Sequence, residues 1–384
     1  MRGGIADSGG AAGGFLKHMG FDQFLGNERI VAALRGMLRR DRAPSALLFT
    51  GPAGIGKYTL ARMFAQAANC ERLKDDFCGE CDSCRRMAPL EDPAPLIKAG
   101  LTERGESADA AAVERMPLIL EPHPDVWLLV PDPVRRLSPV ARPMIRVGQL
   151  RAVQRAAYFK PQGRRRIFIL DGANTMRWND ADLFLKILEE PPESATLILL
   201  APSPDSMLPT IRSRCLQFHL APVPVEEIDA FLKARSDKKP AERKLAAQLA
   251  GGSPGAALEM NLDESTRLRR SILKLLETAI QGGKSSELFA ATAQLAKQEK
   301  ESFENVLGLL YSLLNDLLEL SQGPKNSFSR NPDLQPELQA LSRKIDFEWV
   351  LRATQGLDQL ESRLRRNIGR QLGLDSLLVS LSLR

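Results

Sequence analysis

Residues 51–57 read Gly-Pro-Ala-Gly-Ile-Gly-Lys, and this stretch decides the fold of the chain. It fits the phosphate-binding pattern G-x-x-x-x-G-K, although Tyr58 stands where Ser or Thr normally follows the lysine. The apolar run 47–49 precedes the stretch, and apolar residues at helical spacing follow it at Leu60, Met63, Phe64 and Ala67. A strand, a glycine loop and a helix in this order place backbone N–H groups around a phosphate. The sequence therefore predicts a P-loop domain.

The candidate nucleotide-binding residues are Gly51, Gly54, Gly56, Lys57, Thr59 and Asp171. Tyr58 cannot offer the short aliphatic hydroxyl that holds Mg²⁺ in a P-loop, and Thr59 points about 100° away on the helix. Asp171 ends a buried strand, as a Walker B aspartate does, but Gly172 follows it where ATPases commonly carry an acidic residue. These departures leave ATP binding open, and they predict that the chain does not hydrolyse ATP by itself.

Four cysteines form a candidate metal site directly after the P-loop helix. Cys70, Cys78, Cys81 and Cys84 supply thiolates at a spacing that suits tetrahedral Zn²⁺, with no open position for chemistry. Four of the five cysteines cluster here, which in a reducing compartment favours a metal over disulfides. The sequence predicts a structural zinc, with unligated surface thiols and iron–sulfur ligation as the alternatives.

Length and composition bound the protein class. The 384 residues suffice for two or three domains, and 43% hydrophobic with 26% charged residues describes an ordinary globular protein. No apolar run reaches the roughly 18 residues of a membrane span, and we expect no membrane association. The Gly- and Ala-rich residues 1–19 lack a signal-peptide core, which predicts a disordered extension and a cytoplasmic protein. The net charge of +6 permits nucleic-acid contact, but 5% aromatic residues argue against a base-stacking platform.

The pattern of apolar runs predicts an α/β domain followed by an all-α region. Five short runs of buried-strand type form the expected five-stranded parallel sheet, at residues 47–49, 126–130, 166–171, 196–200 and 216–218. Residues 85–122 are rich in Pro, Ala and acids, and we expect a long loop with a short helix near 108–115. Prolines at 221–224 end the first domain, and everything beyond them has helical spacing.

Two further stretches complete a resemblance to a known family. The P-loop, the four cysteines, the run Lys-Ile-Leu-Glu-Glu-Pro-Pro at 186–192 and Ser-Arg-Cys at 213–215 together resemble the bacterial clamp-loader AAA+ family. The resemblance covers about residues 20–260 and is weaker beyond them. It implies these parts: a disordered extension 1–19, an AAA+ domain 20–222 with a zinc module at 70–84, a helical lid 223–262 and a helical oligomerisation collar 263–384.

Within that family, the motor subunits γ and τ carry Thr after the P-loop lysine and Glu after the Walker B aspartate. Tyr58 and Gly172 depart from that pattern, and the stretch 252–257 lacks the motor's sensor arginine. The resemblance thus implies a hydrolysis-deficient member of a five-subunit ring with γ/τ and δ subunits, acting on the sliding clamp and primer–template DNA. It also implies that Arg214 is an arginine finger offered to a neighbouring subunit. The alternative for Arg214 is a local pair with a carboxylate.

Two other functions remain open from the sequence. One is an active γ/τ-like ATPase whose motifs have diverged, and the other is a zinc-containing nucleic-acid-binding module outside any ring.

Overall fold

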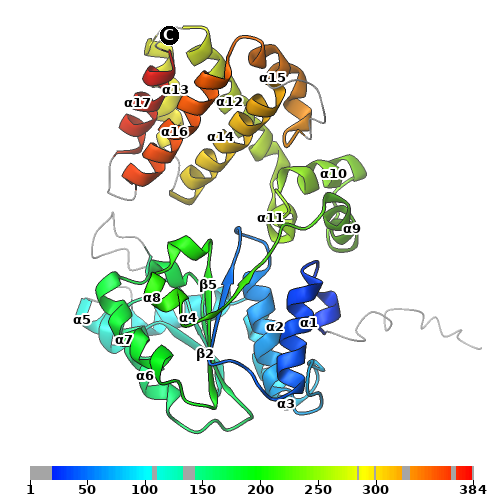
Figure 1. Cartoon of the computed structure of the whole chain (residues 1–384), viewed down its shortest axis with the longest axis vertical. Coiled ribbons are helices and arrows are strands. Elements are labelled where there is room, and N and C mark those ends of the chain that lie inside the picture. The colour runs from blue at the N-terminus through cyan, green and yellow to red at the C-terminus, as the bar shows by residue number, and fades with distance from the viewer. Residues whose placement is uncertain are drawn as a thin grey trace, which may run out of the picture. The chain divides into compact units, whose positions relative to one another are not determined.

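A computed structural model describes residues 20–105, 110–132, 143–282, 285–297, 300–321, 329–364 and 369–382. The chain divides into two compact units, one ending at Val223 and the other beginning at Pro224 (Figure 1). Within the described ranges, no helix combines the length and the apolar character that crossing a membrane requires.

The first unit is built on a six-stranded sheet with the order β2-β3-β4-β5-β1-β6. Five strands are parallel, and β2 runs antiparallel to β3 at one edge. The central strands read as continuous apolar runs because helices cover both faces of a mostly parallel sheet. The strands are β1 (Ala46–Thr50), β2 (Ile119–His123), β3 (Val126–Leu129), β4 (Arg166–Leu170), β5 (Ala195–Ala201) and β6 (Leu216–His219).

The expected α/β class and the five parallel strands are confirmed, but the prediction of a five-stranded sheet is wrong by one strand. The missing strand, β2, lies in the region that we expected to be a loop with one short helix. Its sequence contains Glu121 and Pro122, which are uncommon in strands and therefore weaken the strand pattern. An edge strand tolerates both residues, since one side of its backbone carries no ladder hydrogen bonds.

The same region is more ordered than a loop. It holds α4 (Ala94–Arg104), η2 (Ala88–Glu91) and α5 (Ala110–Arg115), the last of which matches the expected short helix. Arg104 at the end of α4 forms a buried bidentate ion pair with Asp132, with N–O distances of 2.5 and 2.8 Å. This pair attaches the region to the chain that follows β3.

Two helical layers enclose the sheet (Figure 1). One layer holds α1 (Glu28–Arg39), α2 (Lys57–Asn69) and α3 (Asp82–Met87). The other holds α6 (Val147–Ala157), α7 (Trp178–Glu189) and α8 (Pro209–Arg212), whose apolar side chains share a core with β1, β3, β4 and β5. Short 3₁₀ helices complete the unit: η1 (Phe21–Gln23), η3 (Ala173–Thr175) and η4 (Pro204–Ser206).

Among its described residues, the regular secondary structure of the second unit is entirely helical, joined by turns and loops. Three helices pack together at its start: α9 (Val225–Arg235), α10 (Pro240–Leu249) and α11 (Pro254–Glu259). The remaining elements bury one leucine-rich core: α12 (Leu262–Ile280), α13 (Ser285–Ala296), α14 (Lys300–Ser321), η5 (Pro332–Leu334), α15 (Gln335–Ser342), α16 (Phe347–Leu364) and α17 (Arg370–Ser382). The division into a lid at 223–262 and a collar at 263–384 stays a prediction, and residues 1–19 lie outside the described ranges.

Candidate functional site

The P-loop has the backbone that its glycines predicted. Gly51, Gly54 and Gly56 take φ angles of +147°, +73° and +101°, a region that side-chain-bearing residues rarely enter. At Gly51 an added Cβ would also lie 3.0 Å from the Leu220 carbonyl oxygen. The loop therefore needs glycine both for its conformation and for the close approach of the chain after β6.

Lys57 and Asp171 lie near each other at the carboxyl ends of β1 and β4. Burial lowers the pKa of Lys57 and raises the pKa of Asp171, and the opposite charge of each residue partly offsets the shift of the other. The Lys57 ammonium donates to the carbonyl oxygens of Gly51 and Pro52, both at 2.7 Å. The structure thus brings together the lysine and the aspartate that the sequence pointed to, with the lysine folded back onto its own loop. Thr59 lies half-buried in the first turn of α2.

Tyr58 directs its hydroxyl away from the P-loop. The phenol donates a hydrogen bond of 2.6 Å to the Leu90 carbonyl oxygen in η2, and burial raises its pKa. Four residues further along α2, Arg62 donates to Glu91 at 2.9 Å, so η2 is attached to α2 at two points. The residue that replaces the Mg²⁺-binding Ser or Thr therefore holds the segment after the cysteines against the P-loop helix.

Gly172 follows Asp171 in a left-handed conformation, with φ of +73°. A Cβ built there would lie 2.9 Å from the Pro131 side chain, closer than real Cβ contacts allow. The position therefore carries no acidic side chain, and neither its left-handed backbone conformation nor the space beside Pro131 would accommodate one. The sequence showed the first of these facts but not the second.

We expect Gly172→Glu, alone or with Tyr58→Thr, to create no ATPase and to destabilise the protein by about 1–3 kcal/mol through strain and the clash. Thermal unfolding and phosphate release measure both effects. Gly36→Glu is the matched control, because a Cβ there meets only the flexible end of Arg40, at 3.4 Å. An unchanged melting temperature for Gly172→Glu would contradict the steric argument.

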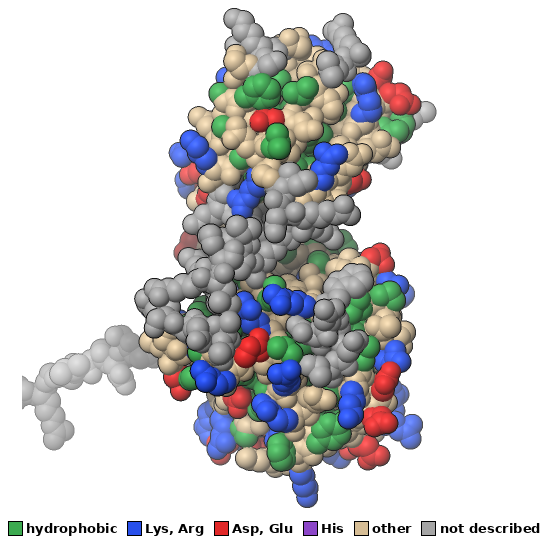
Figure 2. Space-filling model, turned by 90° about the vertical axis from the view of Figure 1, so that its left-hand side faces the viewer, with side chains coloured by type: hydrophobic (Ala, Val, Ile, Leu, Met, Phe, Trp, Pro, Cys, Tyr) green, Lys and Arg blue, Asp and Glu red, His purple; other side chains and the backbone are tan. Residues whose placement is uncertain are grey.

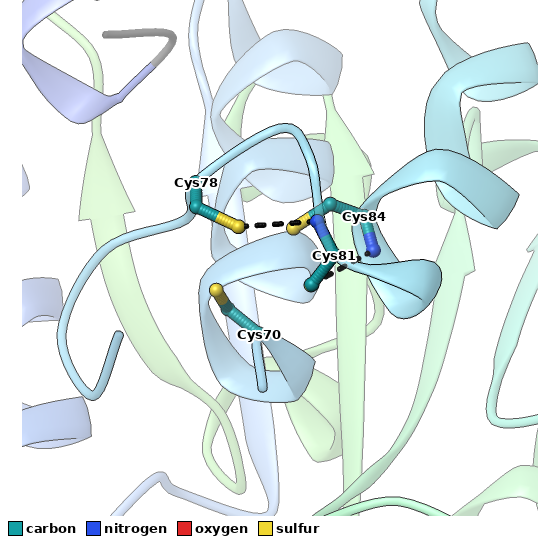
Figure 3. A group of neighbouring side chains, drawn as sticks. All are labelled: Cys70, Cys78, Cys81 and Cys84. Atoms are coloured by element: carbon teal, nitrogen blue, oxygen red, sulfur yellow. Dashed lines mark hydrogen bonds between the residues drawn. The ribbon is translucent and has the colours of Figure 1, made fainter. Parts of the chain in front are cut away.

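The four cysteines converge on one point (Figure 3). Their Sγ atoms all lie within 4.8 Å of one another, and three of the residues are buried while Cys78 is half-buried. Cys70 caps the C-terminus of α2, Cys81 is the N-cap of α3, and Cys84 lies in the first turn of that helix.

Backbone amides point at three of these sulfurs. The N–H groups of Leu73, Cys81 and Cys84 donate to the Sγ atoms of Cys70, Cys78 and Cys81, at 3.4, 3.3 and 3.5 Å. Burial by itself raises the pKa of Cys78, but N–H groups, including those of Glu80 and Cys81, bring that pKa to about 7. Donors aimed at sulfur stabilise the thiolate form, which is the form that binds a metal. The four residues fit a tetrahedral metal ion.

The cysteine module is tied to the sheet by polar contacts. One Nη of Arg164, in the loop before β4, donates to three carbonyl oxygens, those of Ala67, Cys70 and Leu73, at 3.1, 2.7 and 2.9 Å. This cation satisfies carbonyls at the C-terminus of α2, where the helix dipole favours positive charge.

His123 makes a second tie, and its tautomer follows from its partners. The Asp125 amide donates to Nδ1 at 3.1 Å, so in the neutral ring the proton lies on Nε2, which lies 3.1 Å from the Ser83 hydroxyl oxygen in α3. A ring that donates to Ser83 cannot act as the base for that hydroxyl. The group therefore links α3 to β2.

Arg214 lies between α8 and β6 with its side chain 36% exposed. Its guanidinium donates to the Glu189 carboxylate at 2.7 Å and to the Thr210 carbonyl oxygen at 2.9 Å. Glu189 ends α7 inside the run 186–192, so two stretches that carry the family resemblance meet in one ion pair. The chain by itself shows the local carboxylate pair, and the arginine-finger role stays a prediction.

Comparison with known proteins identifies the family. Residues 26–224 match the family model described as DNA polymerase III, delta subunit, and residues 264–382 match the model of that subunit's C-terminal region. The chain belongs to the DNA polymerase III delta subunit family. The resemblance to clamp-loader proteins that the sequence suggested is therefore confirmed.

Individual relatives of two kinds match at similar identity. The tau subunit of Escherichia coli (strain K12) is 28% identical over 210 residues, which are 54% of this chain and 26% of that protein. The delta' subunit of Pseudomonas aeruginosa (strain ATCC 15692) is 29% identical over 243 residues, 61% of this chain and 62% of that protein. The tau subunit of Bacillus subtilis (strain 168) is 26% identical over 311 residues, 79% of this chain and 47% of that protein. The chain thus spans about a quarter of the Escherichia coli relative.

Proposed function

We propose that the chain is a δ′-type subunit of the DNA polymerase III clamp loader that does not hydrolyse ATP. It would occupy a five-subunit ring with γ/τ and δ subunits in the cytoplasm and help to load the sliding clamp on primed DNA. Arg214 would serve the nucleotide of the adjacent motor subunit, and helices 263–384 would form its part of the collar. The observation that carries this proposal is the P-loop with an intact backbone but without catalytic partners.

Three features of the nucleotide site support the loss of hydrolysis. The Tyr58 hydroxyl is bound to the Leu90 carbonyl, Gly172 has neither an acid nor room for one, and Lys57 is bonded to its own loop. Removing one preorganised electrostatic group typically lowers a rate by about 10²–10³-fold, and groups that act together should not be summed. The site could still hold ATP through the loop amides and Lys57, as a ligand rather than as a substrate.

The exposure of Arg214 supports a role across an interface. Its guanidinium pairs with Glu189, whose side chain is also about half-exposed. An exposed ion pair contributes little free energy, so a neighbour's phosphate could replace the Glu189 carboxylate at small cost in stability. The cysteine module would hold a structural Zn²⁺ through Cys70, Cys78, Cys81 and Cys84. Zinc would lock the turn between α2 and α3 and supply no chemistry.

Reconstitution with the cognate γ/τ and δ subunits tests this function. We expect the purified chain to show no ATP turnover and to enter a stable complex, which size-exclusion chromatography with mass measurement detects. Lys57→Ala should change neither result. Hydrolysis by the isolated chain that Lys57→Ala abolishes would support the γ/τ-like motor instead. Failure to associate would favour the nucleic-acid-binding module.

A further inference from the structure

The first unit carries a groove whose lining includes no residue of the P-loop or the cysteine module. This groove of about 440 Å³ lies between the C-terminal half of α6 and the first residues of the neighbouring strands β3 and β4. Its lining residues are Trp127, Ala152, Arg155, Ala156, Phe159 and Arg166. Ala152 and Ala156 lie on one face of α6, and their small side chains leave space that makes the groove deep. The aromatic rings of Trp127 and Phe159 line its sides. Phe159 is 65% exposed, which is unusual for a large apolar side chain with a core nearby.

One residue that lines the groove, Trp127, carries a buried polar atom without a partner among the described residues. Trp127 packs edge-on against Phe168, with ring centroids 5.4 Å apart, and this contact fixes its indole. Its Nε1 is buried and has no hydrogen-bond partner among the described residues. A buried N–H without an acceptor costs free energy, so an occupant that brings an oxygen atom to this point would recover it.

The rim of the groove is basic. Arg151 and Arg155 lie one turn apart on the exposed face of α6, and Lys160 follows Phe159. No hydrogen bond or ion pair involves the side chains of these three residues within the described ranges. Arg166 is already bound to Asp125 at 3.2 Å, and burial raises the pKa of Glu121, which the positive charge of Arg166 in turn lowers.

Basic side chains are common on the surrounding surface. Figure 2 looks onto the side of the first unit that carries α5, α6 and α7, where Lys and Arg side chains lie among hydrophobic side chains and some Asp and Glu side chains. Apolar depth, an unsatisfied donor and a basic rim therefore occur together on one face.

We propose that this groove binds an acidic peptide segment of a partner protein with one apolar anchor side chain. The anchor fills the space beside Ala152, Ala156 and Phe159, and a peptide carbonyl accepts from Trp127 Nε1. Flanking carboxylates pair with Arg151, Arg155 and Lys160. The proposal does not depend on the function in a clamp-loader ring, because none of these residues belongs to the P-loop, the cysteine module or the Arg214 site.

The lining of the groove favours a peptide over single-stranded nucleic acid. A nucleobase presents both donors and acceptors on its edges, whereas the buried unpaired polar atoms of the described lining residues, Trp127 Nε1 and Arg166 Nε, are both donors. The apolar walls leave the other polar atoms of a base unsatisfied, which costs free energy. An aliphatic or aromatic side chain has no such atoms.

The test uses the full-length chain and a fluorescent peptide in which aspartates flank a single leucine. We expect saturable binding by anisotropy that weakens as salt rises. The indole N–H resonance of Trp127, one of three tryptophans and assigned with Trp127→Phe, should shift downfield as the N–H gains an acceptor. Control peptides with Ser in place of Leu, or with Asn in place of Asp, should bind at least about tenfold more weakly.

Two substitutions on the exposed face locate the binding. Phe159→Ala and Arg155→Glu should each weaken the peptide by about tenfold or more, through the anchor and the charge. Phe347→Ala and Arg42→Glu remove or reverse similarly exposed groups elsewhere and should leave binding unchanged. Circular dichroism verifies that each variant is folded.

Several results would overturn the proposal. No saturable binding of the aspartate–leucine peptide would do so, as would binding that ignores both groove substitutions or leaves the Trp127 resonance in place. Tight binding of an oligothymidylate that Phe159→Ala and Arg155→Glu abolish, without peptide binding, would assign the groove to nucleic acid.

Discussion

Arg214→Ala is expected to lower ATP hydrolysis at the neighbouring motor site of a reconstituted clamp loader by about 10³-fold, the scale of an arginine finger supplied in trans. The ring should lose the share of DNA-stimulated turnover that this site provides, and clamp loading should fall with it. Assembly should persist, because the side chain is partly exposed and its pair with Glu189 contributes at most about 1 kcal/mol. Phosphate release and clamp loading, measured on the intact ring, check both expectations.

Two variants separate a finger from a surface ion pair. Glu189→Gln removes the local carboxylate but keeps the arginine, so ring turnover should stay near the wild-type rate. Arg214→Lys keeps the charge but loses the planar fork, and an intermediate rate is expected. Wild-type turnover with Arg214→Ala would reject the finger role and leave Arg214 as the partner of Glu189 alone.

Cys84→Ser is expected to abolish zinc binding and to destabilise the first unit. The purified wild-type chain should contain one zinc per molecule, which metal analysis measures. Structural zinc contributes on the order of 10 kcal/mol of apparent binding free energy in small modules, so the melting temperature should drop strongly. Because Cys70 caps α2 and Tyr58 holds η2, hydrogen exchange should also increase at both ends of the P-loop helix.

Cys215→Ser is the matched control for the metal site. Cys215 is buried, and burial raises its pKa to about 12, so this thiol is inert at neutral pH. The variant should keep its zinc and most of its stability. Full zinc occupancy in Cys84→Ser, or wild-type melting after chelation, would contradict a structural four-cysteine site.

Local patterns were sufficient to predict the P-loop, the five parallel strands and the four cysteines. A glycine loop needs particular residues at fixed spacing, a buried strand needs a short apolar run, and a cysteine cluster needs close thiols. Each signal lies within a few residues of sequence, and the structure places Gly51, Lys57 and Asp171 at one edge of the sheet as those signals required.

The sequence did not predict the sixth strand, β2, because its pairing with β3 and not its composition makes it a strand. Ile119–His123 contains a proline and a glutamate, and only the neighbouring edge of β3 decides that it extends there. In the same way, nothing near Tyr58 in the sequence indicates that its hydroxyl meets the carbonyl of Leu90, 32 residues later.

The sequence by itself determined which chemical groups this protein has and which it lacks: a glycine loop with the pattern G-x-x-x-x-G-K, four clustered thiols, no Ser or Thr directly after Lys57 and no acidic residue directly after Asp171. Only the tertiary structure decided where those groups point. It closed the space at Gly172 with Pro131, paired Arg214 with Glu189 and left the Trp127 N–H without a partner beside an exposed Phe159. The reason is physical: spacing along the chain sets local conformation, whereas contacts between distant segments form only when the sheet brings them together.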